Sequence, residues 1–174
     1  MYYALMIDNN GNGIGSHAYV EQPSSYPSNE VPCTEAQAKN PMAYQVVNGQ
    51  IVESLSYAKT SQIALLQSAF QQAEQAPVSL TLASGVTASF GMTPHDWSKI
   101  IGLYSKYVAK GAALPSGYRI PDVHGTLQAV TVADIENLFN AGETQMTGAI
   151  AKLESLAGQV EAATTVSAVQ AIVW

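Results

Sequence analysis

Residues 118–132, with the sequence YRIPDVHGTLQAVTV, form a short extended run that leads directly into the longest amphipathic segment of the chain. From Ile135 onward, apolar side chains recur every three or four residues, at Leu138, Phe139, Met146, Ile150, Leu153, Leu156 and Val160. This spacing keeps one apolar stripe on one side of a helix, and such a stripe requires a partner surface. We therefore expect the rest of the chain to pack onto residues 118–162.

The start of this helix carries its own signals. Asp134 and Glu136 fall in the first turn, where the free amide groups and the helix dipole favour anions. Thr131 or Thr144 could cap a start or a restart of the helix, because a threonine hydroxyl accepts hydrogen bonds from free amides.

The composition indicates a globular protein with an unusually neutral surface. The chain has 174 residues, of which 47% are hydrophobic, and this is ample for a core. Charged residues make up only 11%, against about 25% in typical soluble domains. Much of the surface must consist of serine, threonine, glutamine and alanine, and such a surface tolerates burial against other chains.

The charge balance argues against nucleic-acid binding. The formal net charge is -6, with one arginine, Arg119, and six scattered lysines, so we expect no nucleic-acid binding, which needs a concentrated basic face.

The apolar runs are shorter than the roughly 18 residues that suggest a membrane span, and we expect a soluble protein without a membrane partner. Cys33 is the single cysteine, so no internal disulfide can form, and synthesis in the cytosol fits.

The first 53 residues are predicted to form a small antiparallel module. Residues 2–7 and 14–20 have strand character around an Asp-Asn-Asn-Gly turn, and the glycines that follow fit a hairpin better than a phosphate loop, because no helix or lysine follows. Residues 23–32 contain three prolines and are predicted to be an extended connector. Thr34 is expected to cap one short helical turn. Residues 44–53 are the clearest hairpin, with an Asn-Gly turn between β-branched runs.

The remaining chain is predicted to be mainly helical. A linking helix over residues 54–76 leads to a hairpin over 78–90 and then to a helix capped by Thr93 that ends at Lys110-Gly111. Thr164 or Thr165 is expected to cap a short final helix. The predicted class is α+β, with an N-terminal β-hairpin module (1–53), a linking helix (54–76) and a C-terminal hairpin-and-helix domain (77–174). We expect the last part to be stable alone and the first to be marginal.

No residue pattern predicts catalysis, a metal site or a cofactor. His17, His95 and His124 are far apart, and none has a paired ligand spacing. Asp122 and His124 are best interpreted as part of a turn, since a nucleophile and an oxyanion site are not identifiable. Cys33 has no paired histidine signature and is interpreted as a structural thiol. We therefore expect no enzymatic activity, no metal and no cofactor.

The candidate functional surface is a protein interface. The 54–76 helix carries only two charges but many glutamines, and neutral amides lose less on leaving water than charges do. Four aromatic residues, including Trp97, could form a carbohydrate-stacking platform, but their helical spacing favours core or interface packing. The predicted interface residues are Gln62, Gln67, Gln71, Tyr104, Tyr107 and Tyr118.

Three stretches carry a family resemblance. Residues 1–11 (MYYALMIDNNG), 31–37 (VPCTEAQ) and 43–52 (AYQVVNGQIV) resemble the N-terminal hairpin module of tailed-bacteriophage proteins encoded beside tail fibres. Residues 54–174, with their helix, hairpin, helix, extended segment and long helix, resemble a phage domain of unassigned function. That family often carries a tryptophan in the extended segment, where this chain has Tyr118 and Arg119.

The resemblance implies a virion tail component, synthesised in the host cytoplasm, that is associated with the tail fibre or baseplate and supplies no catalytic residues. Its implied partners are other phage tail proteins, the tail fibre foremost. The weakly charged 54–76 helix also allows association with further copies of the chain. Two alternatives stay open at this point. One is a tail-fibre assembly chaperone that is absent from the mature virion, and the other is a glycan-binding host-recognition module.

Overall fold

A computed structural model describes all residues, 1–174, and has an α+β fold in which five α-helices accompany four small antiparallel sheets. The predicted class is therefore confirmed. The chain divides into two compact units. The first combines Met1–Leu66 with Leu156–Val173, and the second combines Gln67–Ser155 with Trp174.

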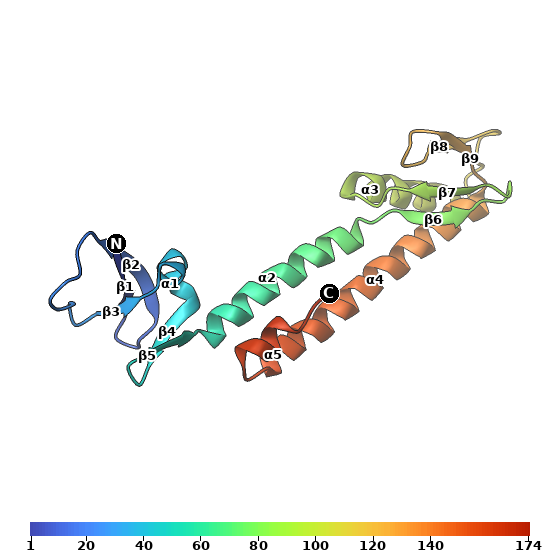
Figure 1. The fold of residues 1–174 in the computed structure, drawn as a ribbon. Helices are drawn as coiled ribbons and strands as arrows, with labels where there is room; N and C mark the ends of the chain where they lie inside the picture. The colour runs from blue at the N-terminus through green and yellow to red at the C-terminus, as the bar shows by residue number, and fades with distance from the viewer. The chain divides into compact units, whose positions relative to one another are not determined.

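A three-stranded sheet forms the N-terminal part of the first unit, with β1 (Tyr2–Ile7) between β2 (Gly13–Tyr19) and β3 (Glu30–Cys33) (Figure 1). The predicted β1–β2 hairpin is confirmed, and its turn is held by the Asp8 carboxylate, which accepts hydrogen bonds from the Asn10 and Asn12 amides at 2.8 Å. Helix α1 (Glu35–Lys39) follows, and Thr34 caps it as expected.

Strand β3 corrects the prediction that residues 23–32 are only a connector. Residues Glu30 to Cys33 pair with β1, although Pro32 cannot donate a backbone hydrogen bond. The strand tolerates this proline because β3 lies at the edge of the sheet and needs to pair on one side only. The predicted count of four strands in residues 1–53 was therefore wrong by one.

The second predicted hairpin is confirmed. After the short 3-10 helix η1 (Pro41–Ala43), β4 (Tyr44–Val47) pairs with β5 (Gln50–Glu53). Its turn residues Asn48 and Gly49 have φ of 52° and 78°, as a type I′ turn requires.

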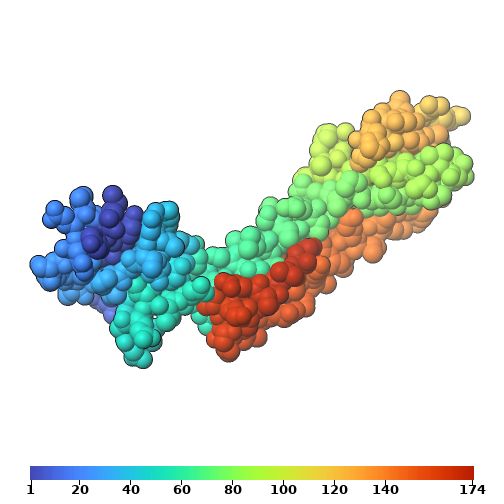
Figure 2. Space-filling view, in the orientation of Figure 1, coloured from blue at the N-terminus to red at the C-terminus, as the bar shows by residue number.

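The first unit also contains the start of α2 (Leu55–Glu74), the end of α4 (Val132–Ala162) and helix α5 (Val166–Gln170), which Thr165 caps. Gln62 of α2 donates to the carbonyl of Ile172 at 2.6 Å, so the last residues of the chain lie against α2 in this unit (Figure 2). Val160 and Val169 are fully buried. By their contacts, residues 156–173 belong with the N-terminal part of the chain. The boundaries of the two units therefore differ from those of the predicted ranges 1–53, 54–76 and 77–174.

The second unit is built around two hairpins and four helical segments, namely the end of α2, α3, η2 and most of α4. Hairpin β6 (Val78–Thr81) with β7 (Thr87–Phe90) is confirmed, and α3 (Pro94–Leu103) begins at the predicted cap, Thr93. The predicted helix to Lys110 changes character, because a π-helix, η2 (Tyr104–Ala109), follows α3. Strands β8 (Arg119–Pro121) and β9 (Leu127–Ala129) make a hairpin within the predicted extended run, and the predicted turn at Asp122 and His124 joins them.

Helix α4 supplies the main buried stripe of this unit. Ile135 and Leu138 are 1% and 2% exposed and belong to the core that contains Phe90, Ile100 and Tyr107. The spacing placed Ile150 on the stripe, but this side chain is exposed, and the adjacent Ala149 is buried instead. The helix begins at Val132, with Thr131 and not Thr144 at its start, since Thr144 bonds the Asn140 carbonyl inside the helix.

The C-terminal end of α2 is held by one side chain of α4. The Gln145 amide nitrogen donates to the carbonyls of Ala73, Glu74 and Ala76 at 2.8 to 3.2 Å. The last carbonyls of a helix have no partner within the helix. This side chain therefore caps α2 within the second unit.

Candidate functional site

The structure separates the three glutamines of the predicted interface. Gln62 is partly buried and bonded to the Ile172 carbonyl in the first unit, whereas Gln67 and Gln71 are exposed on the part of α2 that belongs to the second unit. Gln67 and Gln71 are four residues apart and therefore share one face of the helix. These two keep the geometry that a partner surface needs.

The three tyrosines of the predicted interface all lie in the second unit and take part in its core. The Tyr104 ring stacks on Phe139 with a centroid distance of 4.0 Å and an interplanar angle of 17°. Tyr107 is only 6% exposed, and its ring lies 5.9 Å from that of Tyr118. The rings of Tyr104 and Tyr107 are thus engaged in packing and are not free to form a broad platform for a sugar.

Tyr107 and Tyr118 also line an open cleft of about 430 Å³ in the second unit. The end of β7, helix α3, η2, β8 and α4 each contribute to it. Figure 2 shows the surfaces of the α3 region, in yellow-green, and of the β8 region, in amber, next to each other. The cleft has an apolar lining made by Phe90, Ile100, Leu103, Tyr107, Ile120 and Leu138. Its size is that of ordinary ligand pockets, which hold about 300 to 1,000 Å³.

Three cationic side chains surround this apolar lining. Lys99 of α3, Lys106 of η2 and Arg119 of β8 all line the cleft and are exposed. The chain has only seven lysines and arginines, so nearly half of its cationic side chains gather at one site. None of the three forms an ion pair, and the Lys106 ammonium lies 4.9 Å from the Tyr107 ring centroid. The cleft therefore presents unpaired positive charge in a protein of net charge -6.

The one acidic side chain of the cleft is already engaged. Asp96 Oδ2 accepts a hydrogen bond of 2.6 Å from the Thr93 hydroxyl, at the cap of α3. Sequence reasoning described the lysines as scattered and missed this site. The seven-residue interval from Lys99 to Lys106 was a signal that both lie near one helix face, but the position of Arg119 depends on the β8–β9 hairpin.

A π-helix forms one wall of the cleft. The segment Tyr104–Ala109 carries both Lys106 and Tyr107. Such widened turns are rare and occur frequently at functional sites, because they rotate the following side chains relative to a regular α-helix. Here the widened turn coincides with a charged cleft, and this marks the cleft as the best candidate binding site of the second unit.

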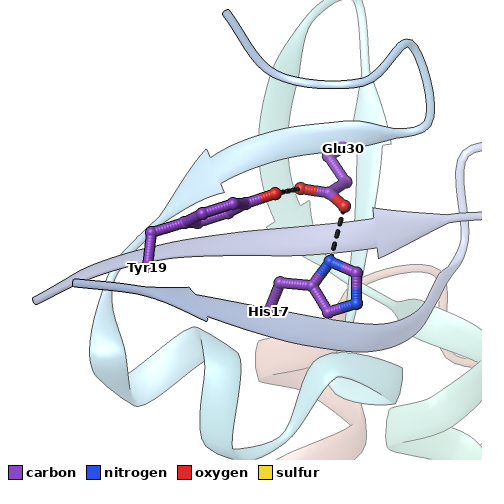
Figure 3. Close-up of polar contacts among 3 residues, drawn as sticks. All are labelled: His17, Tyr19 and Glu30. Carbon is purple, nitrogen blue, oxygen red and sulfur yellow. Dashed lines mark hydrogen bonds and ion pairs between the residues drawn. The ribbon is translucent and has the colours of Figure 1, made fainter. Parts of the chain in front are cut away.

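The first unit contains a polar cluster that the sequence did not reveal. Glu30 of β3 has a side chain only 3% exposed, and its two oxygens bond His17 Nδ1 at 2.6 Å and the Tyr19 hydroxyl (Figure 3). Both partners lie on β2, so the three side chains reach across the central strand β1, where the fully buried Ala4 leaves space. A buried carboxylate must be paired or hydrogen-bonded. The cluster therefore ties the two edge strands together.

The hydrogen bond to the Glu30 carboxylate, with burial and the negative charge of Glu30 adding to it, raises the pKa of Tyr19 above its usual value. A raised pKa stabilises the fold below the usual pKa of tyrosine, and this contribution is lost as the pH rises through the folded value. We expect Glu30→Gln to return the Tyr19 pKa towards its usual value. Phenolate absorbance against pH measures this, with Tyr19→Phe identifying the contribution and Glu21→Gln as the exposed control. An unchanged titration in Glu30→Gln would remove Glu30 as the cause.

The remaining candidate residues take structural positions. Asp122 Oδ1 accepts the His124 and Thr126 amides at 2.9 Å, so the predicted turn is confirmed, and the hydrogen bond from Gln128 is the main cause of the lowered pKa of Asp122. Burial raises the pKa of the Cys33 thiol. His95 is exposed in the first turn of α3.

The structure contains no group of three or more histidine, cysteine or acidic side chains that could hold a metal ion. None of its helices combines the length and apolar character needed to cross a bilayer. The chain matches no protein-family model, no curated protein and no solved structure at a significant level.

Proposed function

We propose that this chain is a structural or accessory component of a bacteriophage tail, associated with the tail fibre or baseplate and acting through protein–protein contacts. The observation that carries the proposal is the exposed face of α2 in the second unit. Gln67, Gln71 and Gln72 are exposed there, Gln75 is exposed directly after the helix, and Glu74 is the only charged residue of the stretch. Burial of neutral amides costs less free energy than burial of charges, so this face can enter an interface at low cost.

The assignment to a phage tail is supported by the resemblance of residues 1–11, 31–37 and 43–52 to the hairpin module of proteins encoded beside tail fibres. The residues behind that resemblance form strand β1 with its turn, most of β3, a capped helical turn and the β4–β5 hairpin. Mass spectrometry of purified phage particles tests the proposal. A structural component is expected to remain in the particle at a fixed ratio to other tail proteins, whereas an assembly chaperone would be present in infected cells and absent from particles.

Two lysines on the neutral face of α2 are expected to weaken association without unfolding the chain. In Gln67→Lys/Gln71→Lys, any partner seated on this face must bury two added charges, and we expect affinity to fall at least about tenfold. Sedimentation of the purified protein and incorporation into particles are the measurements. Gln22→Lys/Gln50→Lys adds the same charge at exposed positions of the first unit and serves as the control. Equal association of both variants would show that α2 does not form the interface.

A further inference from the structure

We infer that the cleft of the second unit, between α3, η2 and β8, binds an acidic segment of a partner protein that inserts one apolar side chain. The apolar lining calls for an apolar side chain in the ligand, and the three surrounding cations call for acidic groups beside it. Leu103 and Tyr118, which are half-buried, and the exposed Pro121 offer a surface for an aliphatic or aromatic group. Carboxylates on either side of that group would meet the cations.

The charges are free to act on a ligand. Lys99, Lys106 and Arg119 have no acidic partner within the 4.0 Å that defines an ion pair, and against the single acid Asp96 the three cations leave the cleft with a surplus of two positive charges. Like charges around one cleft repel each other, and an anionic ligand removes this repulsion. Arg119 can also bond a carboxylate through two nitrogens, which fixes the orientation of the ligand.

The form of the cleft favours a segment of a protein chain. It is an open cleft with solvated cations, so a ligand is covered on one side only and can continue beyond the site. A volume of about 430 Å³ accepts one large side chain with the adjoining main chain. The choice of occupant rests on the proposed function, since a protein that acts through protein contacts binds chains and not metabolites.

A peptide titration of the purified full-length chain tests the inference independently of particle composition. The probe is a capped glutamate-phenylalanine-glutamate peptide, followed by amide NMR shifts, with an expected dissociation constant on the order of 1 mM. Shifts should concentrate at the residues that line the cleft. Replacing both glutamates of the peptide by lysine, or its phenylalanine by alanine, should abolish binding. Affinity should also fall with added salt, because the cations are exposed.

Substitutions in the chain provide a second test of the inference. Arg119→Gln and Lys106→Gln should each weaken binding of the acidic peptide about fivefold, and Arg119→Lys should retain part of it. Lys110→Gln removes a nearby exposed cation that does not line the cleft and should leave binding unchanged. All of these side chains are exposed, so the variants are expected to fold.

Three results would overturn the inference. The first is equal binding of the acidic and the lysine peptide. The second is binding of phenylacetate, a small aromatic carboxylate, without binding of the acidic peptide, since the cleft would then serve a small molecule. The third is concentration-dependent dimerisation of the chain alone that Arg119→Gln abolishes, since the occupant would then be a second copy. Absence of the chain from particles, by contrast, would count against the proposed function and leave the peptide result standing.

Discussion

Replacing Asp134 with alanine is expected to lower the free energy of unfolding by about 3 kcal/mol. The Asp134 carboxylate is 3% exposed and accepts hydrogen bonds from the backbone amides of Ala83 and Thr131, each at 2.8 Å, and from the Thr131 hydroxyl at 2.7 Å. It therefore joins the start of α4 to the β6–β7 hairpin. Truncation removes three hydrogen bonds to one carboxylate, and since Ala83 and Thr131 are exposed and their amides can bond water, each lost hydrogen bond is expected to cost about 1 kcal/mol net.

Chemical denaturation followed by the fluorescence of Trp97, which packs against the core of the same unit, measures this loss. Asp134→Asn keeps one accepting oxygen and should lose less than alanine. Glu136→Gln removes an exposed acid from the same helical turn and is expected to change stability by less than about 0.5 kcal/mol. Equal stability of Asp134→Ala and Glu136→Gln would show that the carboxylate does not tie the hairpin to α4.

The pH dependence of stability provides a second, independent test of the role of Asp134. Burial acts to raise its pKa, but the hydrogen bonds from Thr131 and Ala83 outweigh burial and lower the pKa below the usual 3.8. A depressed carboxyl pKa contributes stability that is complete above the usual value and is lost as the pH falls through the folded value. The wild-type chain should therefore lose more stability below about pH 4 than Asp134→Asn does.

Local signals in the sequence predicted most of the secondary structure. Asn48-Gly49, Thr34, Thr93 and Thr165 each mark a turn or a helix start, and the structure has these elements where the residues place them. Such signals act within four residues of the chain, so they can be interpreted without knowledge of tertiary contacts.

The features that the sequence missed all depend on residues distant along the chain. Strand β3 exists because residues Glu30 to Cys33 find an open edge of β1, which the prolines alone do not indicate. The grouping of residues 156–173 with the first unit depends on the return of α4 to α2. The basic cleft requires Arg119 of β8 to reach the side of α3 that carries Lys99. Each of these residues could be identified in the sequence, but their proximity in the fold could not be predicted from it.

Two glycines of α4 are expected to respond in opposite ways to alanine. A Cβ at Gly142 would lie 2.4 Å from the Trp97 ring, whereas a Cβ at Gly148 would have no atom within 4 Å. Alanine stabilises a helix interior by about 0.5 to 1 kcal/mol relative to glycine. Gly148→Ala should show this gain, since nothing opposes it.

At Gly142 the gain is outweighed by overpacking. The Trp97 ring cannot move away freely, because it stacks on Phe139 at a centroid distance of 5.4 Å, and Phe139 in turn stacks on Tyr104. Overpacking a core costs about 1 to 3 kcal/mol, so we expect Gly142→Ala to lose about 1 kcal/mol net and to differ from Gly148→Ala by about 2 kcal/mol. Denaturation midpoints give the stabilities, and near-ultraviolet circular dichroism reports the displaced Trp97 ring. Equal stabilisation by both alanines, with an unchanged aromatic spectrum, would mean that Trp97 does not lie against Gly142.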